Sequence, residues 1–137
     1  MNGLLSNSGQ IWILDAIRTK INSIGGLYVG LMTNTVSPNR DDQTPTGIFE
    51  LSSVNCSGYS RQLCSTWTYV SGVSPYLIGS GVTFTIASGS WSNVYGYFIS
   101  SNNTNSGVLW TELLPADKCG VVASGNPIIL SPMYYQY

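Results

Sequence analysis

From residue 27 onward, the sequence consists of short apolar or alternating segments separated by clusters of Gly, Ser, Asn and Pro. The segment "GVTFTIAS" (81–88) alternates most regularly, so Val82, Phe84 and Ile86 would face one side of a strand and the intervening threonines the other. Other segments with the composition of strands are 27–33, 48–52, 58–70, 93–100, 108–114 and 126–137. Strands of this length and spacing favour an antiparallel β-sandwich or a jelly-roll-like barrel.

The clearest pairing signal lies at residues 93–114. Two strand-like segments, 93–100 and 108–114, are joined by "SNNTNSG", whose residues tolerate left-handed and Asx-turn geometry. Segment 93–100 is expected to alternate in the same way as 81–88. We therefore predict a β-hairpin over 93–114.

One helix is predicted before the strands, over about residues 8–22. Apolar residues recur there at spacings of three and four, which places them on one helical face: Ile11, Leu14, Ile17 and Ile21. Gly25 and Gly26 would end the helix. The predicted fold class is thus mainly β, an antiparallel β-sandwich or jelly-roll-like barrel with one N-terminal α-helix. The 137 residues fit a single domain, 1–137, that begins with an arm at residues 1–6.

The low charge of the chain restricts its partners. Charged residues make up 8% of the sequence, against about 25% in a typical soluble domain. A net charge of −1 gives little repulsion between copies, so we expect the chain to pack against other chains. The five cations are scattered, which argues against binding of nucleic acid. We expect no membrane contact, because no apolar run approaches the ~20 residues of a membrane span.

The chain offers few ligands for a metal ion. Cys56, Cys64 and Cys119 are either free buried thiols or one Cys56–Cys64 pair with one thiol left over. We favour the reduced state, because the N-terminal residues do not resemble a secretion signal. Three separated cysteines without histidine do not match a zinc site, and Asp41 and Asp42 lack the further oxygen ligands of a calcium loop. We expect no metal ion or cofactor.

Catalysis is not expected either. A serine or cysteine nucleophile usually needs a histidine base, and the sequence has none. Glycosidases use two facing carboxylates, for which Glu50 and Glu112 are the only candidates on predicted strands. A strand carboxylate near an arginine is more often structural, so we expect both glutamates to bind backbone groups or Arg61. The prediction is a protein that is not an enzyme.

Aromatic residues make up 12% of the chain. Many lie on or beside predicted strands: Trp67, Tyr69, Trp91, Tyr95, Tyr97 and Trp110. Because Tyr and Trp are enriched at protein interfaces, we interpret them as core and subunit contacts. The alternative is a sugar-binding face, which would need exposed aromatics on one concave surface beside Asn or Asp.

An ordered series of segments covers the chain from about Ser8 to Leu114: "SGQIWILDAI", "LYVGLMTN", "FELSSVNCSGYSRQ", "VTFTIASGSW", "VYGYFIS" and "GVLWTELLP". This series resembles small structural proteins of tailed-bacteriophage virions. No single segment is specific, whereas their order is. The resemblance implies a capsid decoration or cement protein on the outer capsid surface, a homotrimer that binds the major capsid protein. The alternatives are a tail, neck or fibre-attachment component, or a carbohydrate-binding adhesin module.

The same resemblance assigns structural roles to particular residues. Its structural anchors are Glu50, Tyr59, Arg61, Trp110 and Glu112. We expect Arg61 to pair with Glu50 or Glu112 and so to hold two strands in register. Contacts with neighbouring chains are expected from the apolar arm and from the C-terminal tyrosines: Met1, Leu4, Leu5, Tyr134, Tyr135 and Tyr137.

Overall fold

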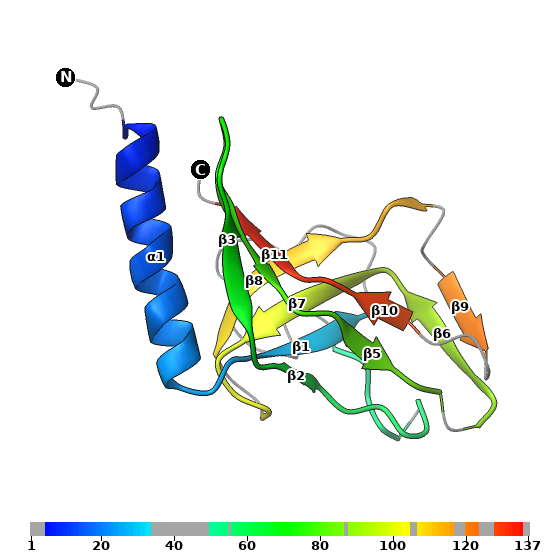
Figure 1. Cartoon of the computed structure of the whole chain (residues 1–137). Helices are drawn as coiled ribbons and strands as arrows, with labels where there is room; N and C mark the ends of the chain where they lie inside the picture. The colour runs from blue at the N-terminus through cyan, green and yellow to red at the C-terminus, as the bar shows by residue number, and fades with distance from the viewer. Residues whose placement is uncertain are drawn as a thin grey trace.

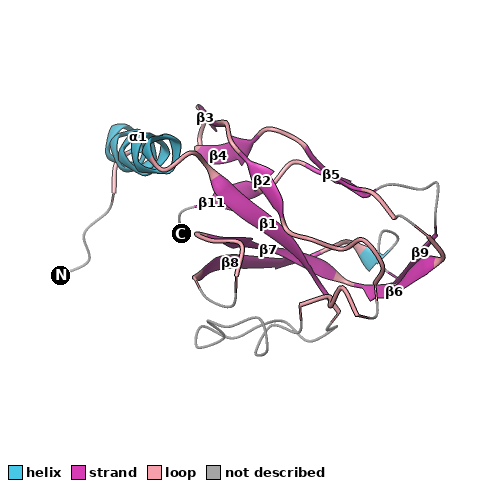
Figure 2. Cartoon of the chain, turned by 90° about the horizontal axis from the view of Figure 1, so that it is seen from below, coloured by secondary structure: helices cyan, strands magenta, loops and turns pink. Residues whose placement is uncertain are grey.

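The computed structural model describes residues 5–33, 50–54, 56–86, 88–104, 107–116, 120–123 and 128–135 of the chain. In these residues one N-terminal helix is followed by strands in antiparallel sheets. The strands wrap around a common core in a sandwich-like arrangement, and the helix stands at one end of it (Figures 1 and 2). The predicted fold class is therefore confirmed.

Helix α1 (Asn7–Ser23) has the predicted position and the predicted end. The Ser6 side chain caps it by accepting a hydrogen bond from the Gly9 amide at 3.1 Å. Gly25 and Gly26 follow with left-handed φ angles of 84° and 114°. A Cβ on Gly26 would lie 2.3 Å from the Cys64 carbonyl oxygen, so only glycine fits this turn. Leu14 and Ile21 are buried, and α1 packs against strands β3 and β4.

The first sheet has the order β2-β1-β7-β8, with strands β1 (Leu27–Met32), β2 (Gln62–Cys64), β7 (Gly96–Ser100) and β8 (Val108–Leu113). The predicted hairpin is confirmed by the pairing of β7 with β8. The predicted alternation of residues 93–100 is wrong in β7, which is buried at every position. Tyr97 and Ile99 face the main core, whereas Phe98 packs with Met32 in a second, smaller cluster.

The second sheet has the order β11-β4-β3, with strands β3 (Trp67–Val70), β4 (Tyr76–Gly79) and β11 (Met133–Tyr135). Its ladder continues into the pair β5 (Val82–Phe84) and β10 (Ile128–Leu130). Met133 pairs with Ile78 and Leu130 pairs with Val82. The chain from β4 to β5 therefore has one residue more between these two pairs than the chain from β10 to β11. Pro132 sits at this offset, where its carbonyl accepts from the Gly79 amide at 2.8 Å.

The remaining pair is β6 (Ser90–Val94) with β9 (Gly120–Ala123). Strands β4 and β9 were not predicted, and of β6 only residues 93–94 fall in a predicted strand segment, 93–100. Segments 58–70 and 126–137 each form two strands rather than one, because the chain passes from one ladder to the next within them. Segment 48–52 was predicted as a strand, but its described part contributes a single bridge between Glu50 and Met32.

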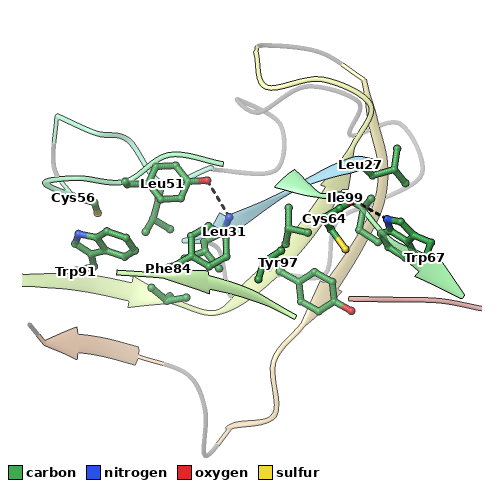
Figure 3. Close-up of a cluster of buried hydrophobic side chains, with 14 of the residues drawn as sticks. Leu27, Leu31, Leu51, Cys56, Cys64, Trp67, Phe84, Trp91, Tyr97 and Ile99 are labelled. Carbon is green, nitrogen blue, oxygen red and sulfur yellow. Dashed lines mark hydrogen bonds between the residues drawn. The ribbon is translucent and has the colours of Figure 1, made fainter. Parts of the chain in front are cut away.

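The main core is rich in aromatic side chains (Figure 3). Val82, Phe84 and Ile86 are buried and Thr83 and Thr85 exposed, as their alternation predicts. The indole N–H groups of Trp67 and Trp91 donate to the Cys64 and Ser57 carbonyls, each at 3.0 Å. Aromatic residues therefore fill the core without leaving these polar groups unsatisfied.

The cysteines of the described residues are free thiols. Cys56 and Cys64 are both buried, and neither forms a disulfide. The alternative of a Cys56–Cys64 disulfide is therefore wrong. Burial raises the pKa of each thiol. Cys119 lies outside the described residues, as do Asp41 and Asp42.

Candidate functional site

The first candidate region is a buried polar group that we call the Glu50 cluster, formed by Glu50, Tyr59, Arg61 and Ser100. Arg61 Nε donates to Glu50 Oε1 and its Nη2 to Glu50 Oε2, both at 2.8 Å. The Arg61 side chain is 3% exposed and that of Glu50 15%. The predicted ion pair of Arg61 is therefore present, two-pronged and buried, and its partner is Glu50 rather than Glu112.

The rest of the Arg61 guanidinium is also engaged. Nη1 donates to Ser100 Oγ at 3.1 Å and to the Asn102 carbonyl at 2.8 Å. The guanidinium lies over the Phe98 ring, 4.8 Å from its centroid. Phe98 in turn covers Gly30, where a Cβ would lie 2.2 Å from Phe98 Cζ. Arg61 thus connects the segment at residue 50 to β1 and to the end of β7.

Tyr59 connects the same cluster to the backbone of β1. Its hydroxyl donates to Glu50 Oε1 at 2.9 Å and accepts from the Leu31 amide at 3.0 Å. The Leu31 carbonyl accepts from the Leu51 amide at 3.0 Å. The pairing of β2 with β1 ends at Val29. Beyond this point, Tyr59 and Leu51 provide the hydrogen-bond partners of the Leu31 amide and carbonyl. The cluster therefore closes an edge of the first sheet.

The environment of Tyr59 favours its neutral form. Burial raises the pKa of the phenol, and the neighbouring Glu50 carboxylate raises this pKa further. A neutral hydroxyl can donate to Glu50 and accept from Leu31 at the same time. The cluster is thus a closed set of donors and acceptors within one chain.

Glu112 lies apart from the Glu50 cluster. The Tyr97 hydroxyl donates to Glu112 Oε2 at 2.5 Å. Tyr97 and Phe98 are consecutive in β7 and so point to opposite faces of the sheet, and Arg61 lies over Phe98. Each glutamate therefore binds a different tyrosine, and the Arg61 guanidinium that pairs with Glu50 lies on the Phe98 face, whereas Glu112 lies opposite Tyr97. This arrangement does not match two carboxylates that flank one substrate. Trp110, opposite Ile99 on the neighbouring strand, packs partly buried against the main core.

Of the predicted interface residues, the structure places one side chain. Leu5 is 48% exposed just before α1. The backbone of Tyr134 and Tyr135 belongs to β11. The side chains of these two tyrosines lie outside the described part of the structure, together with Met1, Leu4 and Tyr137.

The second candidate region is an apolar groove of about 700 Å³ between α1 and the first sheet. We call it the α1 groove, with Trp12, Ala16, Lys20 and Ile24 on the helix and Leu109 and Trp110 on β8. Of the lining residues that the structure describes, Lys20 is the only charged one, and Ser101 is the only one with a hydroxyl or amide side chain. Trp12 is 75% exposed, and Ile24 and Leu109 are about half exposed. Among the described residues that line the groove there is no Asn or Asp, the side chains that a sugar-binding face would need.

The α1 groove was not predicted from the sequence, because the apolar spacing of Ile11, Leu14, Ile17 and Ile21 indicates only the buried face of the helix. A signal was present in the spacing of Trp12, Ala16 and Ile24, which differ by multiples of four and therefore share a helical face. Tyr69 is a further exposed aromatic residue, and the Arg18 guanidinium lies 5.4 Å from its ring centroid. Arg18 also forms an ion pair with Asp15, at 2.5 Å.

The described residues include no group of three or more His, Cys, Asp or Glu side chains placed to hold a metal ion. In the same part of the chain, no helix is long and apolar enough to cross a membrane. Comparisons with protein-family models, with curated proteins and with solved structures find no match for the chain. The Glu50 cluster and the α1 groove are therefore interpreted from their own geometry.

Proposed function

We propose that the chain is a non-enzymatic structural protein of a tailed-bacteriophage virion, most specifically a capsid decoration or cement protein. The observation that carries the proposal is the Glu50 cluster. Glu50, Tyr59 and Arg61 are among the residues on which the resemblance to virion proteins rests, and they meet in one buried group. Their hydrogen bonds are made within the chain, which supports an anchoring role rather than a chemical one.

The surface of the protein supports the same proposal. A net charge of −1 and 8% charged residues leave copies with little electrostatic repulsion. Exposed apolar side chains gather along the α1 groove, where Trp12 is the largest. Such a surface favours packing against other chains in an assembly, where many modest contacts act together. The partners proposed are the major capsid protein and further copies of the chain, arranged as a homotrimer on the outer capsid surface.

The test is the copy number of the chain in purified particles of the phage that encodes it. Calibrated gel densitometry would compare its band with that of the major capsid protein. A number close to that of the major capsid protein is expected for a decoration protein. A few copies per particle would replace the proposal with a tail, neck or fibre-attachment role, and absence from the particles would overturn a virion role altogether.

A second experiment separates decoration from passive incorporation. Shells that lack the chain would be heated with and without added purified chain, and release of the packaged DNA would be followed by dye fluorescence. A cement protein is expected to raise the temperature of release. Binding without any shift would leave a decoration role but contradict the stabilising one.

A further inference from the structure

We infer that the α1 groove is a contact between two copies of this chain, in which their α1 helices pack antiparallel about a two-fold axis near Ala16. The inference goes beyond the proposed function and does not rest on it. It concerns a contact other than the homotrimer contact, because an isologous two-fold interface joins two copies.

Helix α1 carries an exposed ridge of side chains that is suited to a contact with another helix. Four residues at intervals of four run along the helix, the C-cap residue continues the spacing, and all five are exposed: Ser8, Trp12, Ala16, Lys20 and Ile24. Ridges with this spacing are the ones that most often interdigitate between packed helices. A ridge that faces water normally carries polar residues, whereas this one carries Trp12 and Ile24. The ridge therefore has the composition of a helix contact.

The ridge is complementary to the same ridge of a second copy. With Ala16 at the axis, antiparallel packing places Trp12 of each copy opposite Lys20 of the other. An ammonium group over an indole is an attractive cation–π pair, and in the described part of the chain Lys20 is the only charged residue that lines the groove. The small side chain of Ala16 lets the helices approach closely. At each end, Ile24 of one copy would meet Ser8 and the half-exposed Leu5 of the other.

The area of one face of α1 limits how strong this contact can be. Helix α1 has 17 residues and is therefore about 25 Å long and about 10 Å wide. One helix face covers less than the ~800 Å² per partner of a standard stable interface, so a weak dimer with a micromolar dissociation constant is expected. The groove volume of about 700 Å³ can receive the indole of the opposite copy, which removes roughly 150–250 Å² from water. Trp12 is thus the expected hot spot.

The experiment measures the mass of the purified chain in solution by sedimentation equilibrium across the micromolar range. The proposed homotrimer is an arrangement on the capsid surface, so for the free chain the expected mass rises with concentration toward twice the 14.8 kDa of one chain. Trp12→Ala is expected to raise the dimer dissociation constant at least tenfold. Val73→Ser is the matched control, because Val73 is an apolar residue that is 99% exposed and does not line the groove. This control should leave the dissociation constant unchanged.

A crosslinking variant tests the geometry. Ala16→Cys would place two thiols at the two-fold axis, so a disulfide-linked dimer is expected on a non-reducing gel after mild oxidation. Thr19→Cys is exposed but off the ridge, and together with the unmodified chain it gives the background. Equal crosslinking of Ala16→Cys and Thr19→Cys would overturn the two-fold arrangement.

The remaining outcomes also decide the inference. A chain that stays monomeric at all concentrations, or a trimer that Trp12→Ala does not weaken, would overturn it. Binding of a small apolar dye in the groove of a monomer would assign the groove to another ligand. Failure of the proposed function looks different, because it would appear as a low copy number in particles whatever the mass of the chain in solution.

Discussion

The Glu50 cluster buries an ion pair, and the α1 groove exposes a tryptophan to water. Both arrangements cost free energy in a single chain, and they differ in whether that chain compensates the cost. In the Glu50 cluster, the guanidinium, the carboxylate and the phenol satisfy one another within one chain. The apolar wall of the groove has no such cover among the described residues, and Trp12 remains 75% exposed.

This difference indicates which region should govern stability and which should govern association. Removing one member of a buried, hydrogen-bonded set leaves the others desolvated and unpaired. Truncating an exposed apolar side chain leaves the folded chain almost unaffected but removes area from a contact with another chain. The following predictions test this division, from the largest effect on the free energy of unfolding to the smallest.

Arg61→Ala should have the largest effect. It leaves the Glu50 carboxylate buried without its cation, which costs about 3–5 kcal/mol in the free energy of unfolding. The measurement is urea denaturation followed by tryptophan fluorescence. Arg18→Ala is the control, because its ion pair with Asp15 is partly exposed and should contribute about 0.2–1 kcal/mol. Equal losses in the two variants would contradict a central role for the cluster.

Gly30→Ala should come next. The added Cβ would lie 2.2 Å from Phe98 Cζ, and the Phe98 ring cannot retreat because Arg61 covers it. Overpacking of this kind costs about 1–3 kcal/mol, and we expect the upper end. Gly9→Ala provides the contrast, because its neighbour is the flexible end of Leu5 and alanine favours helix. Thermal denaturation should show a lower midpoint for the first variant and no decrease for the second.

Tyr59→Phe should cost about 1–2 kcal/mol, because it leaves the buried Leu31 amide without its acceptor and removes a donor to Glu50. Chemical denaturation at neutral pH measures the loss. A loss no larger than that of Tyr69→Phe, at an exposed tyrosine, would contradict closure of the β1 edge by the Tyr59 hydroxyl.

The same variant has a predicted pH dependence. The pKa of Tyr59 in the folded chain is raised above its ordinary value of 10.0, first by burial and then by Glu50. The neutral phenol therefore contributes stability that is complete below pH 10 and is lost as the pH rises further. The difference in free energy of unfolding between the wild-type chain and Tyr59→Phe should shrink above pH 10. A difference that stays constant would argue that Tyr59 does not stay neutral in the cluster.

Trp12→Ala should have the smallest effect on folding. The side chain is 75% exposed, so at concentrations where the chain is monomeric the free energy of unfolding should change by less than about 0.5 kcal/mol. Urea denaturation of dilute samples measures this change. A large loss would show that Trp12 supports its own fold, and the contrast between the two regions would disappear.

The sequence predicted elements whose pattern is local. Helix α1 follows from the apolar spacing around Leu14 and from the glycine pair at its end, and β5 from the alternation of Val82 with Phe84. Pairing of Glu50 with Arg61 was one of the alternatives expected for the strand glutamates, and the resemblance gave Arg61 the two candidate partners Glu50 and Glu112. Neither Glu50 nor Arg61 lies in a local sequence pattern that predicts their two-pronged ion pair.

The features that were missed depend on distant parts of the chain. Strand β7 is buried on both faces because Arg61 covers Phe98 on one side and the main core covers Ile99 on the other. No feature of residues 93–100 reveals what covers each face. The division of 126–137 into two strands at Pro132 depends in the same way on the Gly79 amide of a distant strand.

The Glu50 cluster also affects how the chain can be synthesised. Its hydrogen bonds join residues far apart in sequence, with separations of 28 positions from Leu31 to Tyr59 and 41 from Arg61 to Asn102. Synthesis proceeds from the N-terminus, so β1 leaves the ribosome before Leu51 and Tyr59, which cover the Leu31 backbone. During that interval the Leu31 edge is bare and can pair with another chain. A nascent chain can therefore cover this edge only after residue 59 has emerged, and the last partner of Arg61 follows with residue 102.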